Sequence, residues 1–121
     1  TAAHHRLDSL TVIVDRNELQ AMGKTEDRMG VEPLAEKWKA FGWRVLEMDG
    51  PDMADILRVL DEAAHGDGRP VVVIAHTVKG KGVSFMEGHY FWHTRVIKPE
   101  EFAQAMADLG EPLPASEGEP R

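Results

Sequence analysis

Three short stretches of the chain carry the apolar and β-branched residues that are typical of strands. Residues 10–14 and 70–75 are apolar throughout, and residues 43–48 alternate between apolar and polar positions. A strand that is apolar on both faces is typical of a parallel sheet covered on both sides. We therefore expect three strands, with the first and third buried.

Three other segments, 33–41, 53–64 and 99–109, repeat apolar residues at helical spacing, so each predicts a helix with one inward face. Pro33 and Pro99 suit the first turn of a helix, where the missing N–H costs nothing. The predicted inward positions are Leu34, Trp38 and Phe41; Met53, Ile56, Leu57, Leu60, Ala63 and Ala64; and Phe102, Ala105, Met106 and Leu109.

The strands and helices alternate, which predicts an α/β fold: a three-layer parallel sheet with helices on both faces and right-handed crossovers. Two long segments, 15–31 and 76–98, lack a period and should be irregular loops. They follow strands, and ligands in such sheets bind beyond the carboxyl ends of the strands. Residues 1–7 look like the last turns of a helix. We expect one domain over residues 1–109 and a flexible tail over residues 110–121.

Charge and composition exclude several classes of protein. The 14 basic and 21 acidic residues give a net charge of −7, which opposes non-specific nucleic-acid binding. No apolar run approaches the ~20 residues of a membrane span. With no cysteine, the chain has neither disulfides nor thiolate metal ligands. A cytoplasmic protein that contacts neither nucleic acid nor membrane is expected.

The first candidate for chemistry is the turn after the first strand. Asn17 and a nearby main-chain carbonyl could present neutral oxygens to a hard divalent ion, although an Asx-rich turn is also common without a ligand. Mg²⁺ and Ca²⁺ accept such oxygens, and Mg²⁺ is typically completed by phosphates and water. One amide and one carbonyl cannot hold the ion alone, so a carboxylate must come from elsewhere.

The second candidate is the segment Thr77-Val-Lys-Gly-Lys-Gly-Val-Ser84, followed by Trp92-His93 in the same loop. Glycines allow close approach of the backbone to a phosphate, and Lys79 supplies a charge, but the spacing of a P-loop is absent. His93 can donate to a phosphate or move a proton near neutral pH. Taken alone, each pattern is also explained by packing or by a solvated turn.

Together these segments resemble a known family. Residues 7–20 are similar to the second half of the thiamine diphosphate motif of transketolases, and residues 34–45 to the helix and strand that follow it. Lys79-Gly-Lys-Gly-Val-Ser-Phe-Met-Glu87 with Trp92-His93 resembles the cofactor loop in the N-terminal subunit of bacterial split transketolases. The resemblance covers residues 2–109 and implies the C-terminal part of a thiamine-diphosphate-binding domain.

The resemblance also implies roles for individual residues. Asn17 and the main-chain carbonyl of Leu19 match the positions that hold Mg²⁺ or Ca²⁺ on the cofactor diphosphate. Asp15 matches a position lining the same pocket, and Lys79 falls where the family's loop approaches the diphosphate. His93 matches a histidine that contacts the diphosphate near the substrate, and it is therefore the candidate catalytic residue.

The family's reaction moves a two-carbon ketol unit between sugar phosphates, and this chain would anchor the cofactor. Two parts of the family's site are missing from the 121 residues: the upstream Gly-Asp-Gly element with the metal's carboxylate, and the pyrimidine-binding domain, which is a partner chain in split enzymes. Thr94 and Ile97 depart from the usual small residue and proline after the histidine. This sequence therefore matches the family's pattern less well around the substrate than around the cofactor.

Three alternatives remain open from the sequence. The chain could belong to another thiamine diphosphate enzyme, such as a deoxyxylulose-phosphate synthase or an acyloin-forming enzyme. It could be a non-catalytic α/β module that binds a phosphate group or dimerises. It could also be the ordered remainder, or a fragment, of a longer chain.

Overall fold

The computed structural model describes residues 1–112, so most of the expected tail lies outside the described residues. Its centre is a parallel sheet of three strands, β1 (Thr11–Arg16), β4 (Arg44–Asp49) and β5 (Val71–His76). The order across the sheet is β1-β5-β4, so β5 is the central strand. The parallel α/β fold that the sequence predicts is confirmed.

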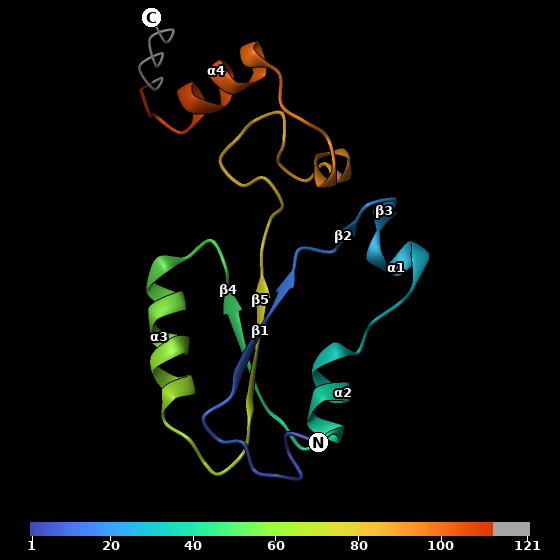
Figure 1. Ribbon diagram of the computed structural model, residues 1–121, viewed down its shortest axis with the longest axis vertical. Helices are drawn as coiled ribbons and strands as arrows, with labels where there is room; N and C mark the ends of the chain where they lie inside the picture. The colour runs from blue at the N-terminus through green and yellow to red at the C-terminus, as the bar shows by residue number, and fades with distance from the viewer. Residues whose placement is uncertain (113–121) are drawn as a thin grey trace, which may run out of the picture.

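Two helices cover opposite faces of this sheet. The connection from β1 to β4 carries α2 (Leu34–Ala40), and the connection from β4 back to β5 carries α3 (Met53–Ala64). Right-handed crossovers that run in opposite directions put their helices on opposite faces, and Figure 1 shows α3 and α2 on either side of the strands. Within the described residues no helix has both the length and the apolar content to cross a membrane.

The central strand supplies most of the core. Val71, Val73 and Ala75 are 0–3% exposed and pack with Val59 and Ala63 of α3. Val72 and Ile74 of β5 point to the other face and are equally buried. Because alternate residues of a strand face opposite sides, β5 must be apolar at every position, as its sequence is.

The first strand does not match the prediction of a strand buried on both faces. Residues of β1 alternate between exposed and less exposed, and Ile13 is 54% exposed. The physical reason is its position, because β1 is at the edge of the sheet and α3 packs mainly on β4 and β5.

The apolar faces of the helices are also buried less than predicted. On α3, Ile56 and Ala63 turn inward together with Val59, whereas Met53 and Leu57 are 66% and 63% exposed. The stripe on this helix is wider than the surface that two strands offer it. Five other predicted inward residues are also exposed: Phe41, Leu60, Ala64, Phe102 and Leu109.

The two long loops contain more regular structure than expected. Residues 15–31 include a hairpin of β2 (Leu19–Gln20) and β3 (Gly23–Lys24), followed by the one-turn helix α1 (Thr25–Arg28). The second loop carries the 3-10 helix η1 (Tyr90–His93) and leads to α4 (Pro99–Asp108).

The helix expected near the start of the chain is absent. Residues 2–6 form turns: His5 N–H, bonded to the Thr1 carbonyl at 3.0 Å, makes the one bond of α-helical spacing in this segment. The N–H groups of Arg6 and Leu7 then donate to the carbonyls of Ala3 and Ala2, both at 3.1 Å. Arg6, with φ of 51°, takes the left-handed conformation and ends this turn.

Replacing Val59 by alanine tests the α3–sheet contact. The side chain is 1% exposed, so the loss of its two methyl groups should lower the free energy of unfolding by about 2 kcal/mol. Urea denaturation measures this loss. The same substitution at Val96, which is 83% exposed, is the matched control and should change stability by less than about 0.5 kcal/mol. Equal losses at the two positions would contradict this packing.

Candidate functional site

The carboxyl ends of the three parallel strands meet at one edge of the sheet, and the loops that follow them come together there (Figure 1). The Thr77 hydroxyl, after β5, donates to the carboxylate of Asp15 at the end of β1. Gly50, after β4, donates its N–H to the carbonyl of His76 at 2.9 Å. The element η1 lies against β2. The elements that carry Leu19 and His93 are therefore neighbours.

The chain turns sharply where it leaves β1. The Oδ1 atom of Asn17 accepts a hydrogen bond from the N–H of Leu19 at 2.9 Å, which forms an Asx turn. Glu18, between them, has φ of 61°, in the left-handed region. Asp15, Asn17 and Leu19 all line one cleft at this end of the strand, so three of the predicted cofactor residues lie together.

The pairing of the hairpin fixes the direction of the Leu19 carbonyl. Paired residues of an antiparallel ladder alternate between hydrogen-bonded and non-hydrogen-bonded pairs. Thr25 N–H donates to the Glu18 carbonyl at 2.8 Å, so the next pair, Leu19 and Lys24, is of the second kind. The N–H and C=O of Leu19 therefore point away from β3. Because that N–H meets Asn17 Oδ1, the two oxygens lie on the same side of the hairpin.

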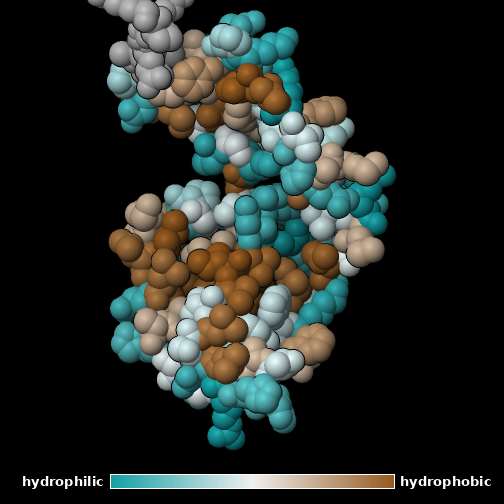
Figure 2. All heavy atoms as spheres, viewed as in Figure 1, coloured by the Kyte–Doolittle hydropathy of each residue, from teal (hydrophilic) through white to brown (hydrophobic). Residues whose placement is uncertain are grey.

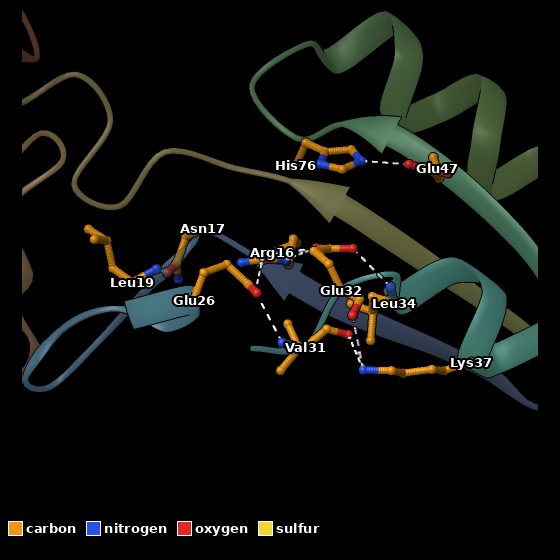
Figure 3. Close-up of polar contacts among 10 residues, drawn as sticks. All are labelled: Arg16, Asn17, Leu19, Glu26, Val31, Glu32, Leu34, Lys37, Glu47 and His76. Atoms are coloured by element: carbon orange, nitrogen blue, oxygen red, sulfur yellow. Dashed lines mark hydrogen bonds and ion pairs between the residues drawn. The ribbon is translucent and has the colours of Figure 1, made fainter. Parts of the chain in front are cut away.

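An ion-pair cluster around a buried arginine borders the cleft (Figure 3). Arg16 is 8% exposed, and its guanidinium contacts Glu32 through Nε at 3.0 Å and Nη2 at 2.9 Å. The same Nη2 contacts Glu26 at 3.0 Å. Glu26 also accepts the N–H of Val31 at 3.1 Å. The cluster thus joins the end of β1 to α1 and to the residue pair just before α2.

The carboxylate of Glu32 has several donors. The N–H of Leu34, at 2.8 Å, and the side chain of Arg16 hold the pKa of Glu32 below its usual value. The sequence prediction missed this cluster. Its members are 10 and 16 positions apart, so no local spacing marks them. The only signal is an arginine placed directly after an apolar strand.

The glycine-rich segment folds back on itself. Gly80 has φ of 72°, and a Cβ there would lie 2.6 Å from the Cβ of Met86. This glycine therefore has a packing role within the loop. Ser84 donates its N–H and hydroxyl to Asp108 of α4 at 2.8 and 2.6 Å. These two donors and Gln104 hold the pKa of Asp108 below its usual value.

The structure places Lys79 and His93 less closely to the Asn17 turn than it places Asp15 and Leu19. Lys79 is half-buried and accepts the N–H of Gly88 on its carbonyl at 2.9 Å, but within residues 1–112 no hydrogen bond or ion pair joins its ammonium group to the Asn17 turn. His93 is exposed at the end of η1. The neighbouring Trp92 anchors η1 through its Nε1–H to the Phe85 carbonyl at 2.9 Å.

The residues at this edge of the sheet could supply some of the ligands of a metal ion, but not all of them. In the described part of the chain no group of three or more histidine, aspartate or glutamate side chains is placed to hold an ion. Asn17 and Leu19 offer two neutral oxygens on one side of the hairpin, which suits a hard cation whose other ligands are phosphates, water and carboxylate.

Comparison with known proteins shows the family to which the chain belongs. A family model described as the thiamine diphosphate binding domain of transketolase matches residues 1–115. The chain is 43% identical over 115 residues to an apulose-4-phosphate transketolase subunit from Phocaeicola vulgatus, covering 95% of this chain and 41% of that protein. It is 37% identical to the 6-deoxy-6-sulfo-D-fructose transketolase subunit SqwG of Clostridium sp., covering 89% of this chain and 39% of that protein. The chain thus spans about two fifths of the length of these relatives.

Solved structures with a similar fold are also transketolases. The fold superposes on transketolase from Campylobacter jejuni with a TM-score of 0.84 and 27% identity, over 91% of this chain and 17% of that one. Transketolase from Leishmania mexicana gives a TM-score of 0.83 at 28% identity, over 91% of this chain and 16% of that one. The chain belongs to the transketolase family, and it forms part of the domain that binds thiamine diphosphate.

Proposed function

We propose that this chain anchors the metal and diphosphate of thiamine diphosphate in a transketolase-type enzyme. The observation that carries the proposal is the shared direction of two oxygens, Asn17 Oδ1 and the Leu19 carbonyl, on one side of the β2–β3 hairpin. Neutral oxygens of this kind coordinate Mg²⁺ or Ca²⁺ and leave the cation charge to be balanced by phosphate and a carboxylate.

A bridging cation also suits the charge of the chain. A net charge of −7 disfavours an anionic ligand unless cations or main-chain donors are placed locally. Lys79 is the cation that we assign to the diphosphate, and Asp15 lines the same cleft as Asn17. When bound, thiamine diphosphate supplies the carbanion nucleophile and the electron sink for breaking a carbon–carbon bond.

We assign His93 to the diphosphate and to the substrate side of the same site. Its element η1 lies against β2, which carries Leu19. Trp92 holds that element while the imidazole of His93 stays exposed. An imidazole there can donate a hydrogen bond to a phosphate oxygen or move a proton near neutral pH.

The reaction that we propose is transfer of a two-carbon ketol unit between sugar phosphates. Relatives at 43% and 37% identity are named as transketolase subunits for apulose 4-phosphate and for 6-deoxy-6-sulfo-D-fructose. The word subunit in those names supports a split enzyme, and we assign the aminopyrimidine half of the cofactor to a second polypeptide. The Gly-Asp-Gly element with the metal's carboxylate must then reach the Asn17 turn from outside the described residues.

The open edge of β1 is the surface that we assign to that element. Ile13, Val73 and Leu46 are paired across the sheet and so share one face. Val73 is fully buried, whereas Ile13 is 54% exposed. Figure 2 shows hydrophobic residues in a band across the side where β1 and α3 lie. An unpaired apolar edge strand is a template for a further strand, and a strand added there would end beside Asn17.

Replacing Asn17 by alanine should weaken Mg²⁺-dependent binding of thiamine diphosphate to the assembled enzyme by about tenfold or more, because the metal loses one ligand. Calorimetric titration of the cofactor at several Mg²⁺ concentrations measures the change. Gln104→Ala removes an amide on α4 that bonds to Asp108 and is the control. An unchanged affinity for the Asn17 variant would refute the metal-anchoring role.

Replacing His93 by alanine should lower kcat/KM for ketol transfer by about 100-fold, the lower end of the range for a positioned acid or base. Steady-state kinetics with saturating cofactor and Mg²⁺ measure the loss. His65→Ala is the matched control, because His65 lies at the C-terminal end of α3 and bonds to Asp61. Wild-type kinetics for the His93 variant would exclude it from the site.

Replacing Ile13 by alanine tests the docking edge in two contexts. In the 121-residue chain the loss of stability should be less than about 1 kcal/mol, because the side chain is largely exposed. With the Gly-Asp-Gly segment present, on the same or a separate polypeptide, burial of Ile13 should raise the loss to about 2–4 kcal/mol. Denaturant unfolding of both forms measures the difference, and equal losses would place the segment elsewhere.

A further inference from the structure

The residue that precedes the predicted metal ligand has an environment unlike that of other charged residues in the described chain. Arg16 ends β1, is 8% exposed, and is the single buried polar residue among residues 1–112. Its two partners are much more accessible, with side chains that are 44% and 52% exposed. The guanidinium is therefore drawn into the protein at the point where the chain leaves the sheet, next to Asn17.

The contacts of Arg16 span the whole segment that carries the metal-binding turn. Glu26 lies in α1, after the hairpin, and Glu32 lies just before α2. The ion pairs thus close loops of 10 and 16 residues onto one side chain. A planar guanidinium with several fixed donors restrains direction as well as distance.

The two carboxylates that contact Arg16 also accept hydrogen bonds from the backbone of the same segment. Glu26 Oε1 also accepts the N–H of Val31, and Glu32 Oε2 accepts the N–H of Leu34 at the start of α2. Lys37 of α2 donates to the carbonyl of Val31 at 2.7 Å. As Figure 3 shows, the two ends of the segment are held to Arg16 and to α2. Between them, the hairpin is held by Thr25 N–H on the Glu18 carbonyl, by Arg28 on the Met22 carbonyl, and by its contact with η1.

We propose that Arg16 is a positioning residue for the metal–diphosphate site, acting through the turn at Asn17 and Leu19. The proposal rests on the function proposed above and adds a residue that does not touch the cofactor. Its ion pairs fix the orientation of the turn, so that Asn17 Oδ1 and the Leu19 carbonyl stay on one side of the hairpin before the metal binds. Preorganised ligands lower the metal concentration that the site needs.

The test is the Mg²⁺ requirement of the assembled enzyme at a fixed concentration of thiamine diphosphate. Arg16→Met keeps the apolar stem and removes the ion pairs. It should raise the Mg²⁺ concentration for half-saturation by about tenfold, as loss of an outer-shell partner does, while excess Mg²⁺ restores kcat. Glu26→Gln, at a half-exposed position, should give a smaller shift and serves if the Arg16 variant does not fold.

The matched control is Arg58→Met. Arg58 also has two carboxylate partners, Asp55 at 2.6 Å and Glu62 at 3.5 Å, but it lies on α3. It should leave the Mg²⁺ requirement unchanged. Loss of thermal stability in the Arg16 and Glu26 variants with an unchanged Mg²⁺ requirement would show a merely structural role and overturn the proposal.

A double mutant separates this proposal from the one on which it rests. If Arg16 acts through the turn, Asn17→Ala with Arg16→Met should need no more Mg²⁺ than Asn17→Ala alone, and the two effects will not add. Fully additive shifts would refute a role through Asn17 and leave the metal-anchoring function standing. If Asn17→Ala by itself leaves the Mg²⁺ requirement unchanged, both the anchoring function and the role of Arg16 fail.

Discussion

The parallel pairing of β1 and β4 with the buried strand β5 is the constraint on which the rest of the structure depends. Residues of β5 from Val71 to Ala75 are at most 3% exposed, so this strand has no freedom to shift along its neighbours. A shift by one residue would bring the polar His76 into the buried part of the strand, or Pro70, which has no N–H to donate, into the ladder. The pairing of Asp15 with Ala75 therefore fixes where the loops after β1 and β5 begin, and it brings Thr77 onto Asp15.

From that edge outward, the site depends on polar contacts instead of apolar packing. The β2–β3 hairpin has strands of two residues and buries little, so packing alone does not define its orientation. The Asx turn at Asn17 and the ion pairs of Arg16 supply the missing restraint. This division is typical of ligand-binding loops carried on a rigid sheet, where the loop supplies the chemistry and the scaffold supplies the position.

The sequence predicted those helices and strands that show a regular spacing of apolar residues. Apolar runs and helical spacing located the three long strands and the helices α2, α3 and α4 to within a few residues. It did not predict the two-residue strands, which are too short to show alternation, or the partners of Arg16, which are distant in sequence. The exposure of Ile13 and Leu57 was also missed, since a pattern shows that a face is apolar but not what covers it. Chemistry alone raised Asn17, Lys79 and His93 as parts of a possible phosphate and metal site. The family resemblance gave these residues their roles and added Asp15 and Leu19.

The central claim is that Asn17 Oδ1 and the Leu19 carbonyl are two of the ligands of a cation that bridges to diphosphate. A crystal structure of the assembled enzyme with thiamine diphosphate and Mg²⁺ tests this claim most directly. The account predicts both oxygens at about 2.1 Å from the metal, within an octahedral shell completed by phosphate oxygens, a carboxylate and water. A metal held at this cofactor without either oxygen in its coordination shell would contradict it.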